Sequence, residues 1–348
     1  MKNFKKILCV LAAALVSVSL ASCNGGNTEN NTDDTQNNQV TTDQNENGTD
    51  GYTIGVIQYV SHPSLDNCYA GVEQALVEKY GDNVTIERQI GSDASADSDC
   101  STYAKQFAAK DADMMIAIAT PAASPAFAAS EDKDIPVVFC AVSDPVSVGL
   151  VQSMEKPGYN CSGTSDVLDM DAQVNLIKAI QPDVKTIGVL YTTSEANSIA
   201  QLELLTVAAQ KQGIEVISSG IQNDADIPAA AAALVEKVDC LNNFTDNKIV
   251  NNLSVVLDAA NSAGIPVYGS EIEQVKNGCL ASVSIDYVAL GKVTGEMAIR
   301  ALEGEALAEM PVQTISDATP VVNTEVMASF GFEMPEGYEN AETVVTNK

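Results

Sequence analysis

Side chains that could bind a small polar molecule recur where the apolar, strand-like runs of this chain end. Hydroxyl, amide and carboxylate groups follow these runs, together with a histidine, two aromatic rings and an alanine. The set comprises Tyr59, His62, Thr120, Ala122, Ser143, Asp144, Ser194, Asn197, Ser198, Phe244, Asp246, Ser270 and Glu271. Hydroxyls and N–H groups at a helix start can hold a carboxylate, and an aspartate can hold an ammonium group. The set therefore favours a binding site for a zwitterion.

These residue types have a second explanation, because Ser, Thr, Asn and Asp also cap helices. For any single position, capping is the simpler interpretation. The whole set is different, since ligands of open parallel sheets bind beyond the carboxyl ends of the strands, where helix N-termini point. Side chains that follow successive strands would converge on one edge, so we expect them to form a site.

Catalysis has little support in the sequence. His62 is the only histidine, so no second one exists for a metal site or a Ser–His pair. The chain has no phosphate loop, Gly-x-Ser-x-Gly elbow or Cys-x-x-Cys motif. The aspartates at 97–99 and 166–171 do not complete a calcium loop and are interpreted as solvated acids. We expect a protein that is not an enzyme and uses no cofactor or metal.

An internal repeat predicts how these groups are positioned. The sequence Thr-Ile-Gly-Val occurs at 53–56 and again at 186–189, and Ile-Pro-Val occurs at 135–137 and again at 265–267. Two motifs that recur at nearly one spacing indicate a duplicated unit. Each copy alternates strand-like and helix-like segments, which is typical of parallel sheets with right-handed crossovers. We therefore expect an α/β fold of two doubly wound lobes, with the ligand between them.

The predicted elements follow the hydrophobic periodicity. Strands are expected at 53–59, 84–90, 114–119, 136–142, 161–165, 186–191, 214–219, 240–243, 266–269 and 280–285. Helices are expected at 65–80, from 120, and at 198–212, 227–235, 251–263 and 287–303.

The last of these helices follows a second copy that is already complete, so we expect it to return to the first lobe. Lobe 1 would then comprise 52–164 and 287–314, and lobe 2 would comprise 165–286 and 315–348. The chain would cross between them near 164–166, 285–287 and 314–321, and such a multi-stranded hinge permits closure around a ligand.

The N-terminus predicts export. Lys2, Lys5 and Lys6 precede an apolar stretch, 7–20, that is too short to span a bilayer comfortably. The following Leu-Ala-Ser-Cys resembles the bacterial lipobox, so we expect a signal peptide at 1–22 and lipidation of Cys23; the rival interpretation is an ordinary secretory signal. Polar residues dominate 23–51, which we expect to be a disordered tether. The protein would be anchored by lipid alone to the outer face of the cytoplasmic membrane.

The net charge limits the possible partners, and the positions of the cysteines indicate their redox state. The formal net charge is −29, from 47 acidic and 18 basic residues, so nucleic acid and anionic lipid surfaces are unfavourable partners. Six cysteines remain outside the leader and Cys23, and several fall in predicted strands, where cysteine acts as a small apolar residue. We expect mostly free, buried thiols.

The strand-end motifs resemble those of a known family, the substrate-binding lipoproteins of ABC importers in the group that includes tryptophan- and tyrosine-binding receptors. The resemblance extends from Tyr52 to Phe332. It is carried by the segments 57–60 with 62–63, 117–123, 136–139 with 141–145, 163–166, 188–191 with 194–198, and 245–247.

The resemblance implies a type I periplasmic-binding-protein fold, no catalysis, and a permease and an ATPase as partners. It also implies roles by position: Ser194, Asn197 and Ser198 at the polar head of the ligand, Thr120 and Ala122 opposite, Asp246 at an ammonium group, and Tyr59 and His62 around the side chain. Phe244 beside Asp246 departs from the usual pattern, which leaves the side-chain specificity open.

We therefore expect a monomeric receptor that captures a small amino-acid-like solute, aromatic and either tryptophan or tyrosine, by hinge closure. A sensory receptor of the same fold and a receptor for another small solute remain open. An extracellular enzyme would need a nucleophile–base pair, and a two-lobed transcription factor is incompatible with the export signal.

Overall fold

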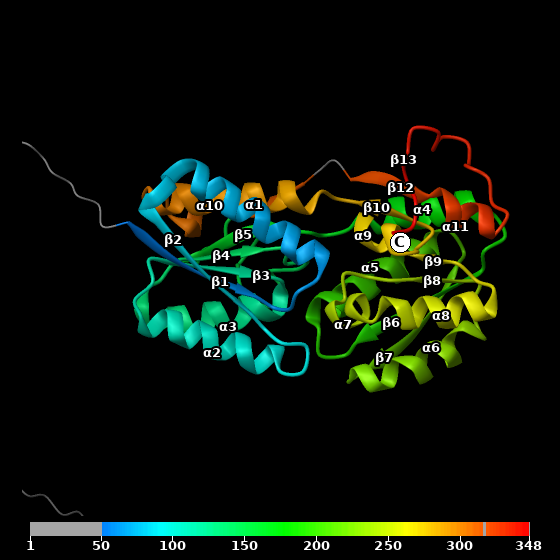
Figure 1. Cartoon of the computed structure of the whole chain (residues 1–348), viewed down its shortest axis with the longest axis horizontal. Helices are drawn as coiled ribbons and strands as arrows, with labels where there is room; N and C mark the ends of the chain where they lie inside the picture. The colour runs from blue at the N-terminus through cyan, green and yellow to red at the C-terminus, as the bar shows by residue number, and fades with distance from the viewer. Residues whose placement is uncertain (1–50, 316–317, 348) are drawn as a thin grey trace, which may run out of the picture. The chain divides into compact units, whose positions relative to one another are not determined.

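The computed structural model describes residues 51–315 and 318–347 (Figure 1). They belong to one unit, Thr49–Lys348. The signal peptide, Cys23 and all but the last residue of the tether lie outside the described residues, and these assignments stay predictions. No helix in the described part is long and apolar enough to cross a membrane.

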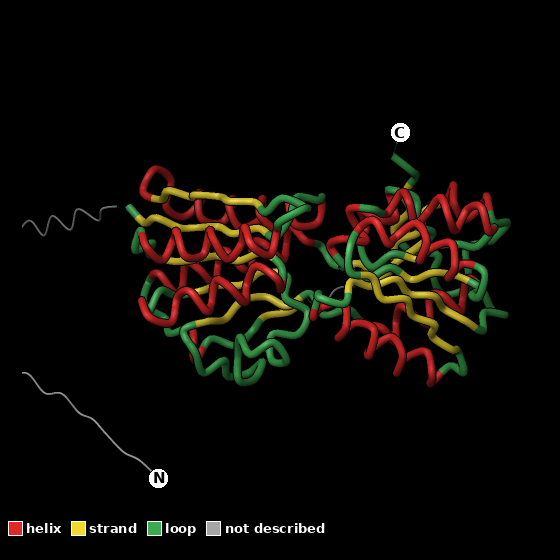
Figure 2. Tube along the Cα trace, turned by 90° about the horizontal axis from the view of Figure 1, so that it is seen from below, coloured by secondary structure: helices red, strands yellow, loops and turns green. Residues whose placement is uncertain are grey.

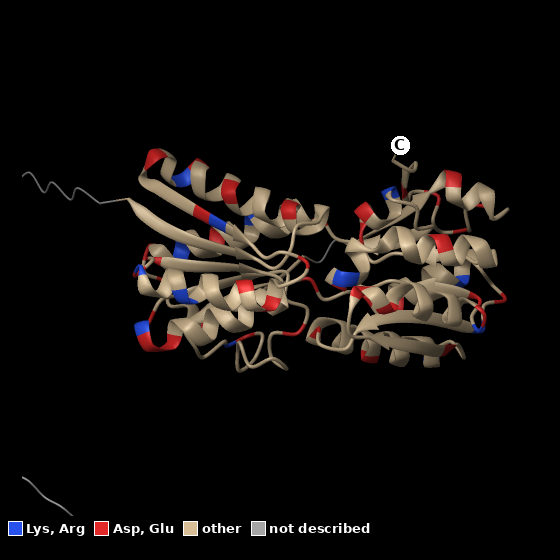
Figure 3. Ribbon diagram, turned by 60° about the horizontal axis from the view of Figure 1, so that its bottom comes forward, with Lys and Arg blue, Asp and Glu red and all other residues tan. Residues whose placement is uncertain are grey.

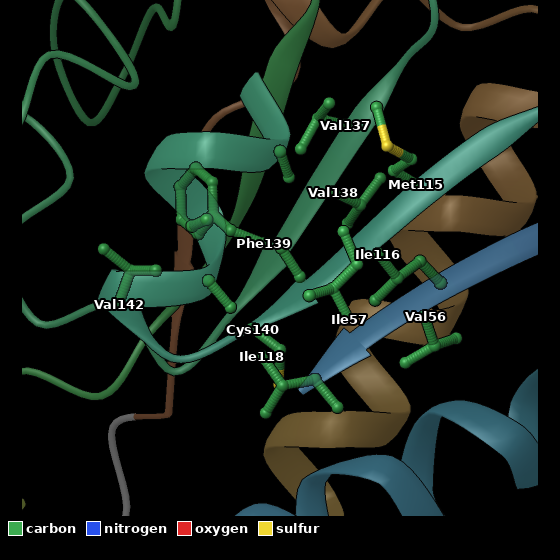
Figure 4. Close-up of a cluster of buried hydrophobic side chains, with 14 of the residues drawn as sticks. Val56, Ile57, Met115, Ile116, Ile118, Val137, Val138, Phe139, Cys140 and Val142 are labelled. Carbon is green, nitrogen blue, oxygen red and sulfur yellow. The ribbon is translucent and has the colours of Figure 1, made fainter. Parts of the chain in front are cut away.

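The first lobe is built on a parallel sheet with the strand order β11-β5-β4-β3-β1-β2. Its strands are β1 (Tyr52–Gln58), β2 (Val84–Ile90), β3 (Met114–Ile118), β4 (Val137–Cys140), β5 (Cys161–Ser165) and β11 (Gln313–Thr314). The central strands are continuous apolar runs because helices cover both faces. Figure 4 shows their interlocking side chains, among them Ile57, Ile116 and Phe139, all fully buried.

Two helix pairs cover this sheet. They are α1 (Pro63–Tyr80) with α10 (Tyr287–Leu302), and α2 (Ala96–Ala109) with α3 (Thr120–Ser130), which lie on opposite faces (Figure 1). The pair α1 and α10 is in backbone contact: a Cβ at Gly71 would lie 2.2 Å from the Val288 carbonyl oxygen, and one at Gly291 would lie 2.1 Å from that of Cys68. The helix α10 also packs against β4 and β5 of the first sheet.

The second lobe has the parallel order β7-β6-β8-β9. Its strands are β6 (Thr186–Thr192), β7 (Glu215–Ile221), β8 (Cys240–Asn242) and β9 (Val267–Tyr268). Backbone hydrogen bonds from Leu280 to Val267 (2.7 Å) and from Gly269 to Ala281 (2.9 Å) join β9 to a smaller sheet. That sheet consists of β10 (Ala281–Ser284), β12 (Thr319–Asn323) and β13 (Glu342–Val344).

Alternation along β6 divides the core of the second lobe between its two faces. Ile187 and Val189 pack in one hydrophobic cluster with α4 (Met170–Ile180) and α5 (Ala196–Lys211). Leu190 points to the other face and packs with α6 (Ile227–Val235) and α8 (Leu253–Ala263). Figure 2 shows the resulting layers of strands between helices in each lobe. The prediction of two doubly wound parallel sheets is therefore confirmed.

The chain passes between the lobes after three strands. It leaves the first sheet after β5, returns from β10 into α10, and leaves again between β11 and β12, where 316–317 lie outside the description. These are the places where the sequence predicts crossings.

Several segments differ from the predictions. The helix expected at 251–263 is two helices, α7 (Asn247–Asn251) and α8, because Asp246 starts a helix earlier in the chain. The helices α2, α4, α9 (Ile272–Lys276) and α11 (Thr324–Ser329) had no counterpart among the predicted elements. In the described part of the chain, six cysteines are buried and free, as expected.

Candidate ligand-binding site

A small cavity, partly open to solvent, lies where strand ends of both lobes meet. It leaves about 20 Å³ free, room for a single water molecule, so an amino acid can enter only if the lobes separate or the wall rearranges. Lobe 1 and its links contribute His62, Ser64, Leu65, Ala119, Thr120, Ala141, Ser143, Asp166 and Tyr287. Lobe 2 contributes Asn197, Thr245, Asn247, Val250, Glu271 and Gln274.

Two turns at the cavity have an uncommon backbone. Ala119, directly after β3, has a φ of 78°, and Ala141, directly after β4, has a φ of 56°. Residues with a Cβ rarely adopt positive φ, and such strain concentrates at functional sites. These turns place Thr120 and Ser143 at the cavity wall.

Asp166 supplies a buried carboxyl group to the wall of the cavity. It follows β5, is only 3% exposed, and accepts hydrogen bonds from the Ser143 hydroxyl (2.8 Å) and the Tyr287 hydroxyl (3.2 Å). Burial raises the pKa of Asp166, although the bonds from Ser143 and Tyr287 act in the opposite direction. The interpretation of this residue as a solvated acid is wrong, because the crossing from β5 to α4 carries it into the interior.

Glu271 supplies a second buried carboxylate. It is 1% exposed, precedes α9, and accepts the backbone N–H groups of Glu273 (2.7 Å) and Gln274 (2.8 Å). The hydroxyl of Ser64, from lobe 1, also donates to it. Burial raises the pKa of Glu271 to about 7. No Lys or Arg is among the residues that line the cavity, so the wall offers carboxyl groups but no positive side chain to pair with them.

A hydrogen-bonded network holds the opposite wall. The Asn247 side chain donates from Nδ2 to Glu195 Oε2 (2.6 Å), and its Oδ1 lies 3.1 Å from His62 Nε2. Asn197 also donates to Glu195 (3.2 Å) and to the Thr245 carbonyl oxygen (3.1 Å). Burial lowers the pKa of His62, and burial together with the charge of Asp246 raises the pKa of Glu195.

Four buried polar atoms at this cavity have no hydrogen-bond partner in the described structure. They are His62 Nδ1, Thr120 Oγ1, Asn197 Oδ1 and Gln274 Oε1. Buried polar atoms are normally paired, so each such atom requires an explanation. Two amide oxygens and two carboxylates offer acceptors, and the cavity is therefore suited to a molecule rich in N–H or O–H donors.

Direct hydrogen bonds join the two lobes around the cavity. Gln201 Nε2 of α5 donates to Ser143 Oγ (3.0 Å), and Asn251 Nδ2 donates to Asp93 Oδ1 (2.9 Å). The contact between His62 and Asn247 and that between Ser64 and Glu271 also cross from lobe to lobe. The structure is thus a closed arrangement.

The structure brings together part of the set proposed from the sequence. His62, Thr120, Ser143, Asn197 and Glu271 line the cavity. The remaining residues do not line it: Tyr59, Ala122, Asp144, Ser194, Ser198, Phe244, Asp246 and Ser270. Ser194 is exposed, whereas Phe244 lies fully buried in the core of lobe 2.

Asp246 requires a correction. It is fully buried, and its two oxygens accept four hydrogen bonds, from Thr192 N, Thr192 Oγ1, Ser198 Oγ and Ile249 N. The carboxylate therefore caps α7 and ties it to β6. The geometry argues against an ammonium contact at Asp246, because its acceptor sites are occupied by the protein itself.

The sequence prediction missed several residues of the wall. Asp166 had a signal, since it directly follows a predicted strand. Asn247 also had a signal, because it lies in a segment that follows a predicted strand. Tyr287 stood at a predicted crossing between the lobes, whereas Gln274 had no signal, because it lies in α9, a helix that the sequence did not predict. No cluster of His, Cys, Asp and Glu suited to a metal ion occurs in the described part of the chain.

Comparison with known proteins agrees with this architecture. The family model for ABC transporter substrate-binding proteins matches residues 53–343. The tyrosine-binding protein of Clostridioides difficile (strain R20291) is 38% identical over 336 residues, which cover 94% of this chain and 93% of that protein.

Two solved structures of relatives differ in what they hold: one is a complex with L-Trp, and the other is ligand-free and open. An ABC domain from Streptococcus pneumonia in complex with L-Trp is 36% identical, has a TM-score of 0.81, and aligns over 84% of this chain and 100% of its own. The ligand-free, open structure of a substrate-binding protein from Clostridium difficile is 40% identical but has a TM-score of 0.66, over 85% and 100%. The structure with the higher sequence identity has the lower TM-score. This order is expected if lobe closure, rather than sequence divergence, causes the difference between the two TM-scores.

The matched residues span nearly all of the described part, and the expected type I periplasmic-binding-protein fold and family resemblance are confirmed. The chain belongs to the family of ABC transporter substrate-binding proteins.

Proposed function

We propose that this protein is the extracytoplasmic receptor of an ABC importer and that it captures an aromatic amino acid, tryptophan or tyrosine, in the cavity. The observation that carries the proposal is the pair of buried carboxylates, Asp166 and Glu271, in a wall without a lysine or arginine. A buried anion needs a positive partner, and the ammonium group of an amino acid supplies one.

The other end of the ligand has a suitable place. The helix α3 begins at Thr120, has no side-chain cap, and starts at the cavity. A helix N-terminus with a free hydroxyl favours a carboxylate. The relatives that bind tyrosine and L-Trp support an aromatic side chain.

The remaining parts of the proposal come from the sequence. Lobe 1 is assigned to 52–164 with 287–314 and lobe 2 to 165–286 with 315–348. Lipidation at Cys23 and the tether would hold a monomeric receptor at the outer face of the membrane, where a permease and an ATPase take up its solute. The protein itself performs no catalysis in this scheme.

The absence of tryptophan from the chain provides a direct assay. Bound L-tryptophan should quench the tyrosine emission of the protein by energy transfer, and calorimetry can follow L-tyrosine and L-phenylalanine. We expect Asp166→Asn to lower the affinity about ten- to hundredfold, because it removes a charge-assisted bond and keeps the side-chain shape.

Asp258→Asn is a matched control, since Asp258 is exposed on α8. It should bind like the unchanged protein. If none of the three aromatic amino acids binds, the proposed ligand class is wrong. If they bind and Asp166→Asn has no effect, Asp166 does not hold the ammonium group.

A further inference from the structure

The orientation of one amide fixes the proton on His62. Asn247 places Nδ2 at 2.6 Å from Glu195 Oε2, and this oxygen is an acceptor because it also receives the backbone N–H of Asn247 (3.1 Å). The atom that Asn247 presents to His62 is therefore its carbonyl oxygen, Oδ1. Because that oxygen can only accept, His62 Nε2 must carry a hydrogen and donate it across 3.1 Å.

The second ring nitrogen is consequently an acceptor. Burial lowers the pKa of His62 and keeps the ring neutral, and a neutral imidazole has one N–H. That hydrogen is already on Nε2, so Nδ1 has a lone pair. His62 is 9% exposed and lines the cavity, and Nδ1 has no partner in the described structure. A buried acceptor of this kind is stabilised only by an N–H or O–H donor.

The surroundings indicate which part of a ligand reaches His62. Leu65 follows His62 by one turn of α1, and Val250 follows Asn247 by one turn of α7, and all four line the cavity. These two apolar side chains suit an aromatic ring. Asp166 and Glu271 have other hydrogen-bond partners, and neither carboxyl group takes part in the His62–Asn247 contact.

We propose that His62 Nδ1 accepts a hydrogen bond from the ring N–H of tryptophan or the phenolic O–H of tyrosine, and that this bond excludes phenylalanine. The inference rests on the proposed function, because it assumes an aromatic amino acid in the cavity. A site built to pair a donor rejects a ligand of the same shape that lacks it, since the acceptor is then left buried and unpaired.

A matched pair of ligands tests the bond. L-tryptophan and 3-benzothienyl-L-alanine have nearly the same shape, but sulfur replaces the ring N–H in the second. We expect the protein to prefer L-tryptophan about ten- to hundredfold. In His62→Phe, which has no acceptor, the ratio of the two dissociation constants should fall to about one.

The ratio of the two dissociation constants is insensitive to a general loosening of the cavity, because such a change weakens the binding of both ligands. His62→Gln is the conservative variant: its amide can donate to Asn247 and still offer an oxygen, so it should retain a preference for L-tryptophan. Equal affinities in the unchanged protein, or an unaltered ratio in His62→Phe, would overturn the inference while leaving the proposed function intact. Failure of every aromatic amino acid to bind would overturn both.

Discussion

Asp166 and Asp246 are both buried carboxylates near strand ends, yet their hydrogen bonds give them different roles. Asp246 accepts four hydrogen bonds from its own lobe. Asp166 accepts side-chain hydrogen bonds from two hydroxyl groups and lines the cavity. An ionised carboxylate has about four lone-pair sites, so Asp166 retains capacity for a ligand and Asp246 does not.

We expect Asp246→Ala to destabilise the fold by about 3 kcal/mol, because it leaves buried donors of Thr192, Ser198 and Ile249 unpaired and removes the cap of α7. Urea unfolding of the ligand-free protein measures this loss, with Asp258→Asn as the control. A variant that unfolds like the unchanged protein but no longer binds amino acids would restore Asp246 as a ligand contact.

For single residues, the sequence predicted the types of side chain at the cavity better than it predicted which individual residues line it. It correctly selected strand ends rich in hydroxyls and amides, and His62, Thr120, Ser143, Asn197 and Glu271 line the cavity. It could not separate Ser198, which bonds to Asp246, from its neighbour Asn197, which lines the cavity. Neighbours at the start of a helix point in different directions, and only the packing of α5 decides which one meets the cavity.

The predicted strands were more accurate than the helices. The observed bounds of β2 and β5 match the predictions, although neither strand is a continuous apolar run: β2 is VTIERQI and β5 is CSGTS. The helix α4 was missed although Val174, Leu176, Ile177 and Ile180 are buried in it. Its start depends on the cap of Asp169, an acid that was interpreted as solvated. The smaller sheet was missed in part because β13 consists mainly of exposed residues.

The close contact between α1 and α10 allows a prediction about how these two helices pack. Gly→Ala usually stabilises a helix by about 1 kcal/mol. Gly291→Ala should do the opposite and cost about 2 kcal/mol or more, because the new Cβ would overlap the Cys68 carbonyl oxygen of the facing helix. Glu296→Ala, exposed on the same helix, is the control. A rise in the unfolding free energy of Gly291→Ala would show that the helices separate freely.

Closure of the whole molecule brings negative charge together. Acidic residues are spread along the ribbon of both lobes (Figure 3), in line with the formal net charge of −29. Three buried carboxyl groups, Asp166, Glu195 and Glu271, lie in or beside the contact between the lobes, and burial raises the pKa of each. Hydrogen bonds such as those from Gln201 to Ser143 and from Asn251 to Asp93 join the lobes across this acidic contact. A cationic group in the cavity would offset the repulsion between these acidic groups. We therefore expect the charge of the ligand and the closure of the lobes to be coupled.

This coupling has a definite pH dependence. With a pKa of about 7, Glu271 is mostly protonated at pH 6 in the closed, ligand-free protein. A neighbouring ammonium group favours the ionised form and lowers that pKa, so binding should release a proton. Affinity should therefore rise as the pH increases from about 5 to 7, by at most about tenfold per unit, and then level off.

Calorimetry at pH 6 in two buffers of different ionisation enthalpy measures the proton released. Glu271→Gln keeps an oxygen for the N–H groups of Glu273 and Gln274 but cannot titrate, so its proton release and its pH dependence should fall. Any remaining release belongs to Asp166 or Glu195, whose pKa values burial also raises. Proton uptake in the unchanged protein would mean that the bound solute presents an anion to Glu271, and an amino acid could not then lie with its ammonium group at this wall.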